Sequence, residues 1–508
     1  MELNTNAKKN TDNKKDGIVK NDIGGKKDLK PKAKSNVVFD ENGSINDSDM
    51  EDESDLEDLE DEDDGECALH KITGYDITTN TGNCLVLNAQ KDHSTASSPF
   101  KLFKFSENTE HSVQVGLKVL QWILSPIVTD EFFNNIFQKR VLVLKRATNG
   151  YFDEFFNTED FKDMLKNNNV LYGQDVNVAT YVSGVRETHN PLKKEMQRAT
   201  IVNALQHFQN GRSLQCVHPQ VFNDKVWYIC DALQEVFCSY VGANNYLTPA
   251  GSAGFAPHYD DIDAFMLQAN TGPDKHSHHV TISFCRKFSY AQFFEQASSE
   301  FIQLLTDESK RLRGSLPPHL FDMCGMANIV YPNEDSLNNR LIPYAKIFSR
   351  KFASDFASYV PAFVDLIAKD FFRTALPPLL SPQEFKQTCM GGGGGCDNFL
   401  DKEKRPLIGP ETEVRLVRMH GQRLLYEDEE SAYLVNRMNN SRRYDENDNE
   451  LSIDFDLKYE DGYVTLCNSY PKWKTVQSLG CDSLEKNIEL ATLLFNNCML
   501  MLRQKEEK

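Results

Sequence analysis

The chain has 508 residues, of which 40% are apolar and 26% are charged, and its formal net charge is −19. This length allows two or three domains, and no apolar run reaches the about 18 residues that a membrane-spanning helix needs. The 12 cysteines include no Cys-X-X-Cys pair, which favours free thiols over disulfides or a zinc site.

Residues 1–66 are predicted to form a disordered tail that is first Lys-rich and then acidic. Residues 1–34 contain 10 lysines and 5 acidic residues, and the basic run Lys26–Lys34 is typical of a nuclear localisation signal. Residues 47–66 contain 14 Asp or Glu and no Lys or Arg, so they cannot bury enough apolar surface to fold. Such an acidic block suits basic partners such as histones or ribosomal proteins.

Residues 67–115 have no clear pattern and form an uncertain linker, after which a packed domain is predicted over 116–288. It opens with an apolar helix or entry segment from Gly116 and continues with helical spacing through Phe132–Phe137. Further helices are predicted over 158–166, 199–209 and 222–241, and strands over 141–144, 175–183 and within 244–284.

Aromatic residues dominate residues 289–376, which are predicted to be helical. They carry more aromatic surface than one small helical layer needs to cover, which favours a homodimer interface; a monomeric helical bundle is the alternative. Residues 377–410 have the prolines and the glycine run of a linker.

Residues 411–508 are predicted to be a small α+β unit with strands at 451–457 and 463–466 and an amphipathic helix over 482–501. From Arg405 to the last residue there are 14 basic and 19 acidic side chains. Because nucleic-acid surfaces need clustered Lys and Arg, direct DNA binding by this unit is not expected.

The triplet His258-Tyr259-Asp260 is the candidate for chemistry. On a strand, side chains two residues apart point to the same face, so His258 and Asp260 would aim an imidazole and a carboxylate at one point. A second histidine would complete the facial triad of non-haem iron(II) oxygenases. The triplet alone also occurs by chance, as a half-exposed strand with ordinary polar residues.

The flanking sequence is more specific. Five stretches follow one another in order: Tyr246-Leu-Thr-Pro-Ala-Gly-Ser, Ala256-Pro-His-Tyr-Asp-Asp-Ile-Asp-Ala-Phe, Gln268-Ala-Asn-Thr, His276-Ser277 and His279-Val-Thr-Ile-Ser. In this order they resemble the JmjC ribosomal oxygenases, which are nucleolar histidyl-hydroxylases also described as histone lysine demethylases. The resemblance extends more weakly from about residue 118 to the last residue.

The resemblance implies an α+β fold: a JmjC cupin-like double-stranded β-helix, a helical dimerisation region and a C-terminal winged-helix domain. It implies iron(II) held by His258 and Asp260, with 2-oxoglutarate as co-substrate and Tyr246 and Thr281 as candidate co-substrate-binding residues. No catalytic residue is expected beyond the metal ligands. The resemblance also implies a chromatin and transcription regulator in the nucleus, and within it the nucleolus, that acts on a ribosomal protein or histone H3.

The sequence departs from the family after Gln268. In the family, several strands separate the His-X-Asp triplet from the Gln-Ala-Asn-Thr stretch; they carry the co-substrate lysine and end in a His-Gln pair that supplies the third iron ligand. Here the chain runs from Phe265-Met-Leu-Gln268 directly into Ala269, and Leu267 stands where the family has its histidine. The β-helix is therefore expected to be incomplete between residues 267 and 269.

The nearby histidines His276, His278 and His279 do not replace the missing ligand in the expected geometry. If a hairpin forms across Asn270–Asp274, His276 falls opposite residue 268, which is roughly 33 Å along the strand from His258. A structural or solvated role is expected for this cluster, with adventitious metal binding as the alternative. Three interpretations therefore stay open: an active oxygenase, a catalytically impaired relative that serves as a dimeric protein-binding module, and an incomplete gene model.

Overall fold

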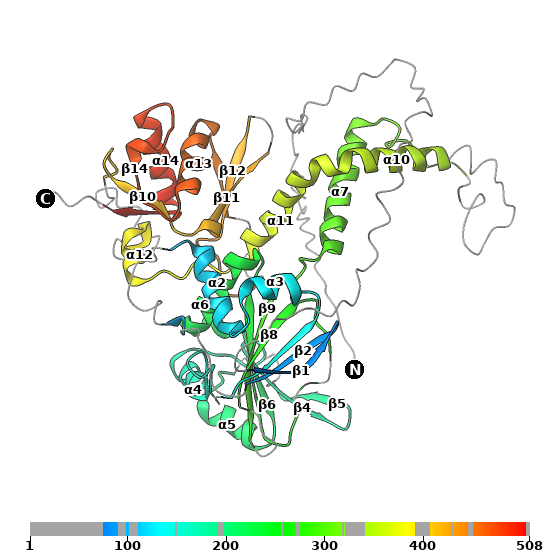
Figure 1. Ribbon diagram of the computed structural model, residues 1–508, viewed down its shortest axis with the longest axis vertical. Coiled ribbons are helices and arrows are strands. Elements are labelled where there is room, and N and C mark those ends of the chain that lie inside the picture. Colours follow the sequence, from blue (N-terminus) through cyan, green and yellow to red (C-terminus); the bar gives the residue numbers. More distant parts are fainter. Residues whose placement is uncertain are drawn as a thin grey trace, which may run out of the picture.

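The computed structural model describes most of the chain downstream of residue 74 (Figure 1). The described residues are 75–89, 98–100, 110–147, 150–191, 197–253, 255, 258–270, 275–316, 318, 320, 341–391, 407–427, 430–444 and 451–503. The predicted tail 1–66, most of the predicted linker 67–115 and the glycines 392–395 lie outside them. No helix in the described ranges is long and apolar enough to cross a membrane.

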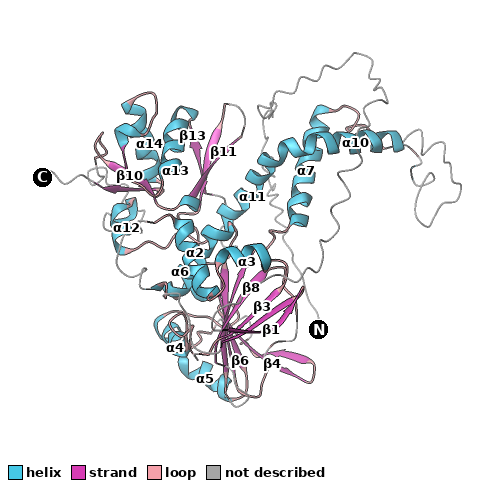
Figure 2. Ribbon diagram, viewed as in Figure 1, coloured by secondary structure: helices cyan, strands magenta, loops and turns pink. Residues whose placement is uncertain are grey.

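A six-stranded antiparallel sheet forms the centre of the first domain (Figure 2). Its strand order is β5-β4-β6-β7-β9-β8. The last two strands, β9 and β8, pair with each other as a hairpin at one edge of the sheet. The strands are β4 Val176–Val182, β5 Val185–Thr188, β6 Ser213–Val217, β7 Gly242–Thr248, β8 Asp263–Asn270 and β9 Ser277–Phe284.

One face of this sheet is apolar and carries the main core. Along β9, His278, Val280, Ile282 and Phe284 are buried while the residues between them are half-buried, which is the period-2 pattern of a strand covered on one side. Helices pack against the buried face: α2 Ser112–Leu124, α3 Thr129–Asn135, α4 Thr158–Asn167, α5 Ile201–Gln209 and α6 Asp224–Phe237. The predicted helices and strands of this domain are confirmed within a few residues.

The α2–α6 contact is close because Gly116 lies in it. A Cβ atom at position 116 would sit 2.3 Å from the carbonyl oxygen of Ala232, a distance that no side chain tolerates. Any larger residue at this position would push α2 away from α6.

The β8–β9 hairpin is confirmed, but its predicted register is wrong. Gln268 lies opposite His279 and not opposite His276, with an irregularity between Gln268 and Asn270. The observed register places Leu267 opposite Val280 and Phe265 opposite Ile282 on the core face. Since a slip of an odd number of residues would turn one strand's apolar side chains outward, burial selects this register.

A second, three-stranded sheet joins the strand predicted at 141–144 to two strands from residues 67–115, for which no pattern was predicted. It contains β1 Tyr75–Thr81, β2 Cys84–Ala89 and β3 Val141–Lys145 in the order β1-β2-β3. β1 and β2 form a hairpin over Gly82-Asn83, a two-residue turn that could have been found in the sequence. The side chains of Leu85 and Leu87 enter the main core, so the packed domain begins upstream of residue 116.

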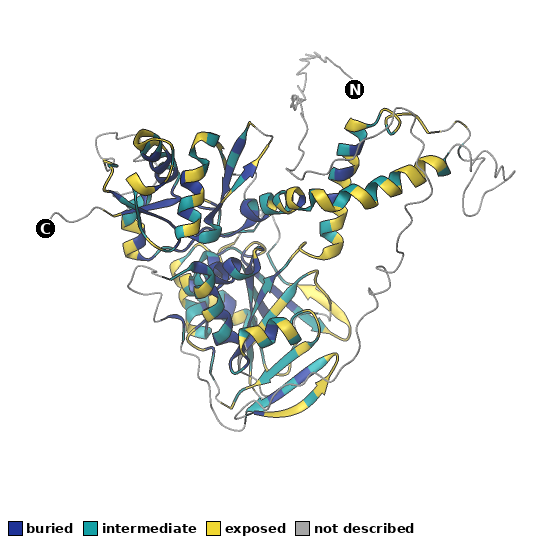
Figure 3. Ribbon diagram, turned by 45° about the horizontal axis from the view of Figure 1, so that its top comes forward, coloured by how far each residue is buried: buried dark blue, intermediate teal, exposed yellow. Residues whose placement is uncertain are grey.

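Within residues 289–376, the described residues form a helical arm that extends from the body (Figure 1). Its helices are α7 Tyr290–Glu308, α10 Ile342–Asp355, η3 Phe356–Tyr359 and α11 Val360–Thr374. Phe301 is fully buried among Phe352, Phe356 and Phe363. α10 buries none of its residues, as Figure 3 shows.

The C-terminal domain contains two three-stranded sheets, with orders β14-β10-β15 and β11-β12-β13. Its strands are β10 Glu413–Leu416, β11 Gln422–Tyr426, β12 Ala432–Asn436, β13 Leu451–Phe455, β14 Lys474–Thr475 and β15 Leu500–Arg503, and its longer helices are α13 Glu460–Ser469 and α14 Leu484–Asn496. The strand predicted at 463–466 is wrong, because these residues lie inside α13. The helix predicted over 482–501 ends at Asn496, and β15 follows it.

The described part of the Pro/Gly stretch 377–410 is packed against the rest of the molecule. Residues Pro382–Gln387 form α12, which begins with a capping box between Ser381 and Glu384. Glu384 is buried and binds Arg418 through an ion pair of 2.9 Å. This stretch therefore joins the domains through a fixed contact over residues 377–391.

Candidate functional site

The His258-Tyr259-Asp260 triplet lies in a loop before β8 and not on a strand, so the predicted strand geometry is wrong for these residues. The two side chains nevertheless face each other, with 3.7 Å between His258 Nε2 and Asp260 Oδ2. Both are more than half exposed, and Tyr259 is 95% exposed. The loop therefore places the two candidate ligands next to each other at a solvent-exposed position.

These residues do not by themselves fit the resident iron of a facial triad. Three protein ligands on one face are needed, and among the described residues no group of three His, Cys, Asp or Glu side chains could hold a metal ion. His258 and Asp260 account for two. Within the described ranges the pair supplies two of the three ligands, and the predicted gap in the site stays a prediction.

We expect the chain to bind iron(II) only weakly, because two exposed ligands give an incomplete chelate. Anaerobic calorimetry with iron(II) or manganese(II) measures this directly, with Asp261→Asn as the matched control for a neighbouring carboxylate outside the triplet. Micromolar or tighter binding that His258→Ala abolishes and Asp261→Asn retains would show that a further residue completes the site.

The polar face of the six-stranded sheet lies opposite its apolar face. Asn244 and Tyr246 of β7 and Thr281 and Ser283 of β9 alternate with buried residues, so all four project from this face. Asn244 is paired with Thr281 across the two strands. Asn245, which the sequence analysis did not separate from its neighbours, is fully buried in the core.

Tyr246 ends a row of side-chain hydrogen bonds that crosses three strands. Asn190 Nδ2 donates to Asn177 Oδ1, Asn177 Nδ2 to Gln215 Oε1, and Gln215 Nε2 to the Tyr246 hydroxyl, at 2.7, 3.2 and 3.1 Å. Gln215 and Asn177 were not predicted as site residues. The alternation of Leu214, Gln215 and Cys216 was the available signal, because it places Gln215 on the face opposite the core.

The triplet loop lies beside Tyr246. The Tyr246 ring stacks on His279 at 4.8 Å and meets Phe255, three residues before His258, edge-on at 5.3 Å. Burial raises the pKa of Tyr246, the hydrogen bond from Gln215 opposes this rise, and the charge of Asp260 adds to it. Tyr246 and Asp260 therefore interact electrostatically, and the polar face and the triplet loop form one candidate site.

Leu267 points away from this site. It is 5% exposed and packs in the core with Val280 and Ile282, on the face opposite Tyr246. A histidine at position 267 would therefore enter the apolar core, and neighbouring Met266, which is 68% exposed, points the other way.

The histidines that follow β8 are structural, as predicted. His278 is buried between the Asn245 amide at 2.6 Å and the Thr158 hydroxyl at 3.3 Å, and burial is the main cause that lowers its pKa to about 4. His279 stacks on Tyr246, and burial lowers its pKa as well. A neutral, hydrogen-bonded His278 supports packing of β9 on α4.

Two family models match the chain. Residues 215–276 match the JmjC domain, and residues 376–505 match the C-terminal winged helix domain of ribosomal oxygenase 1. The first match contains Tyr246, His258 and Asp260, and the second begins where the packed segment around α12 begins.

Curated relatives match most of the chain. The bifunctional lysine-specific demethylase and histidyl-hydroxylase NO66 of Brugia malayi is 32% identical over 93% of this chain and 73% of its own length. The protein of the same name from Caenorhabditis elegans is 32% identical over 81% of this chain, which spans 63% of that relative. Ribosomal oxygenase 1 of Gallus gallus is 30% identical over 78% of this chain and 73% of its own length.

Among solved structures, Escherichia coli ycfD is similar over 74% of this chain and 99% of its own length, with 13% sequence identity. The TM-score is 0.34, which is too low to bear on the site.

Proposed function

This chain belongs to the JmjC-domain family of bifunctional lysine-specific demethylases and histidyl-hydroxylases, and from that membership we propose that it has the architecture of an iron(II)- and 2-oxoglutarate-dependent oxygenase. The substrates that we propose are a histidine of a ribosomal protein or a methyl-lysine of histone H3. The observation that carries the proposal is the His258–Asp260 pair held beside the polar face of the sheet.

In this proposal His258 and Asp260 are the two iron ligands that the chain supplies, and iron with 2-oxoglutarate would provide the oxidising chemistry. Tyr246 and Thr281 are the proposed co-substrate contacts, because they project from neighbouring strands on the same face. The Gln215 hydrogen bond fixes the Tyr246 hydroxyl toward that face.

A second candidate function is favoured by the two-ligand geometry. With no third ligand among the described residues, the chain would be catalytically impaired and would serve as a dimeric protein-binding module with the substrate-facing face retained. Succinate release in the presence of a ribosomal-protein or histone H3 peptide separates the two. Release that Asp260→Ala abolishes and Asp261→Ala retains supports the oxygenase, and no release above a protein-free blank supports the binding module.

We propose that the helical arm makes the chain a homodimer. Tyr290, Phe294 and Ile302 of α7 are 80%, 49% and 44% exposed, and Ile347 of α10 and Val364 of α11 are also nearly half exposed. Large apolar side chains left exposed in this number on one arm are typical of protein interfaces.

Light scattering at micromolar concentration is expected to give twice the monomer mass of 57.9 kDa. The double variant Phe294→Ser/Ile302→Ser is expected to be a monomer, because it removes apolar surface that is 49% and 44% exposed in the single chain and that a dimer would bury. Val202→Ser is the matched control, since Val202 is 80% exposed on α5, outside the arm. A wild-type chain that scatters as a monomer would remove this proposal.

The charges of the C-terminal domain argue against direct DNA binding. Lys486, near the start of α14, is paired with Asp482 at 2.7 Å, and Lys458 lies 3.0 Å from Asp456 and 3.8 Å from Glu489. These cations are already matched by nearby carboxylates, so we propose a protein-contact role for this domain. The nucleus, and the nucleolus within it, is the proposed location, in line with the Lys-rich stretch and the family.

A further inference from the structure

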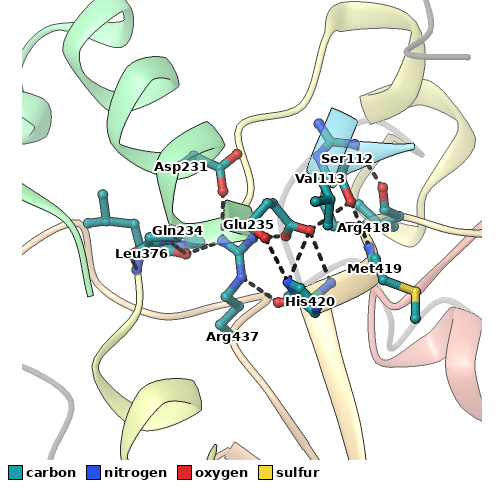
Figure 4. Close-up of polar contacts among 12 residues, drawn as sticks. Ser112, Val113, Asp231, Gln234, Glu235, Leu376, Arg418, Met419, His420 and Arg437 are labelled. Atoms are coloured by element: carbon teal, nitrogen blue, oxygen red, sulfur yellow. Dashed lines mark hydrogen bonds and ion pairs between the residues drawn. The ribbon is translucent and has the colours of Figure 1, made fainter. Parts of the chain in front are cut away.

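The C-terminal domain is fixed to α6 of the JmjC domain by a buried ionic cluster (Figure 4). Arg437, at the end of β12, is fully buried and contacts Asp231 at 2.7 Å and Glu235 at 2.6 Å. Glu235 also accepts hydrogen bonds from the Ser112 hydroxyl and the His420 backbone N–H. Arg437 additionally donates to the carbonyl oxygen of Leu376.

Leu376 connects this cluster to the sheet through Gln234. The Gln234 side chain is fully buried; its Nε2 donates to the Leu376 carbonyl, and its Oε1 accepts from the N–H groups of Leu376 at 2.9 Å and Val241 at 3.4 Å. Val241 is the residue directly before β7. Arg437 is therefore connected through Leu376 and Gln234 to the residue that precedes the strand carrying Asn244 and Tyr246.

A second arginine reaches the same strand by another route. Arg442 stacks on the Trp227 ring at 4.0 Å and donates through its guanidinium to the carbonyl oxygen of Gln220. The side chain of Gln220 is fully buried, and its Oε1 accepts from the N–H of Ala243 at 3.3 Å. Ala243 is the second residue of β7 and immediately precedes Asn244.

We propose that Gln220 and Gln234 are positioning residues. Through them the C-terminal domain fixes the backbone at the start of β7, and thereby the positions of Asn244 and Tyr246 in the candidate site. Both glutamines bind backbone N–H groups that the neighbouring strands leave unused at the start of β7. Arg442 binds the backbone carbonyl of Gln220 directly, whereas Arg437 binds the carbonyl of Leu376, to which the Gln234 side chain also donates. Two buried glutamines on separate elements therefore connect C-terminal arginines to N–H groups at the start of β7.

The consequence is that the C-terminal domain acts on the site without touching it. Arg437 and Arg442 both lie in the segment after β12, whereas Tyr246 lies on the opposite face of the sheet from α6. The proposal depends on the proposed function only for calling Tyr246 a site residue; the hydrogen-bond network itself is independent of turnover.

The test uses the full-length chain and hydrogen exchange of its backbone amides. Gln234→Met and Gln220→Met keep the length and the apolar volume of the side chain but remove the acceptor, so exchange over residues 241–248 is expected to rise about tenfold relative to residues 176–182 of β4. Arg442→Met, a milder change at a partly exposed side chain, is expected to act in the same direction.

Arg418→Met is the matched control, because Arg418 is a buried arginine of the same domain whose contacts are Glu384 and Leu379. It is expected to speed exchange in both strands alike. A 3-fluorotyrosine at position 246 gives a second readout: its ¹⁹F resonance is expected to shift or split in the glutamine variants and to stay in place in Arg418→Met. Equal exchange in 241–248 and 176–182 with an unchanged ¹⁹F resonance in the glutamine variants would overturn the proposal, whether or not the chain turns over 2-oxoglutarate.

Discussion

Replacing Arg437 by methionine is expected to lower the free energy of unfolding by about 3–5 kcal/mol, because it leaves two buried carboxylates without their cation. Asp231 and Glu235 are 4% and 2% exposed, and Arg437 is the side chain that contacts both. Urea unfolding followed by tryptophan fluorescence measures the loss. Arg423→Met, which breaks the more exposed ion pair with Asp365, is the control and is expected to cost less than about 1 kcal/mol.

The pH dependence of the Arg437→Met variant tests whether unpaired buried carboxylates cause the loss of stability. Burial raises the pKa of Asp231, and Arg437 opposes that rise. Without Arg437 the folded-state pKa rises further, so the folded chain binds more protons and the stability loss shrinks as the pH is lowered toward 5. Adding Asp231→Asn and Glu235→Gln should recover part of the loss at neutral pH. A loss that neither acidification nor these substitutions reduces would point to packing instead.

Inserting the family's intervening strands between Gln268 and Ala269 is expected to convert a chain with little or no turnover into one that releases succinate from 2-oxoglutarate. The insertion would restore an opposing histidine and the lysine that holds the co-substrate carboxylate, while the polar face with Tyr246 and Thr281 is already formed. Removing one member of a metal and co-substrate site costs orders of magnitude in rate, so its restoration should give at least a roughly hundredfold gain.

Leu267→His alone is the informative control for this experiment. Leu267 projects into the core beside Val280 and Ile282, so an imidazole there would be buried away from His258 and would cost stability without supplying a ligand. Asp260→Ala in the insertion variant should abolish the gain. Turnover by the unmodified chain that Asp260→Ala removes would mean that residues now present already complete the site.

The sequence was sufficient for those features that depend on local pattern. Period-2 alternation placed Thr281 and Ser283 on one side of a strand, which β9 confirms, since side chains on a strand alternate whatever surrounds it. The ordered stretches around His258 identified the family. The strand predicted at 463–466 failed because apolar spacing over four residues fits a helix as well as a strand.

Tertiary structure decided what depends on residues far apart in the chain. The register of β8 on β9, and hence the inward direction of Leu267, followed from burying Phe265 and Leu267 beside residues of α3 and α6. The pairing of Arg437 with Asp231, 206 residues earlier, leaves no local trace in the sequence. The strand register and the ion pair have the same physical cause. A buried apolar or charged side chain is stabilised by the residues that contact it, and those residues become its neighbours only when the chain folds.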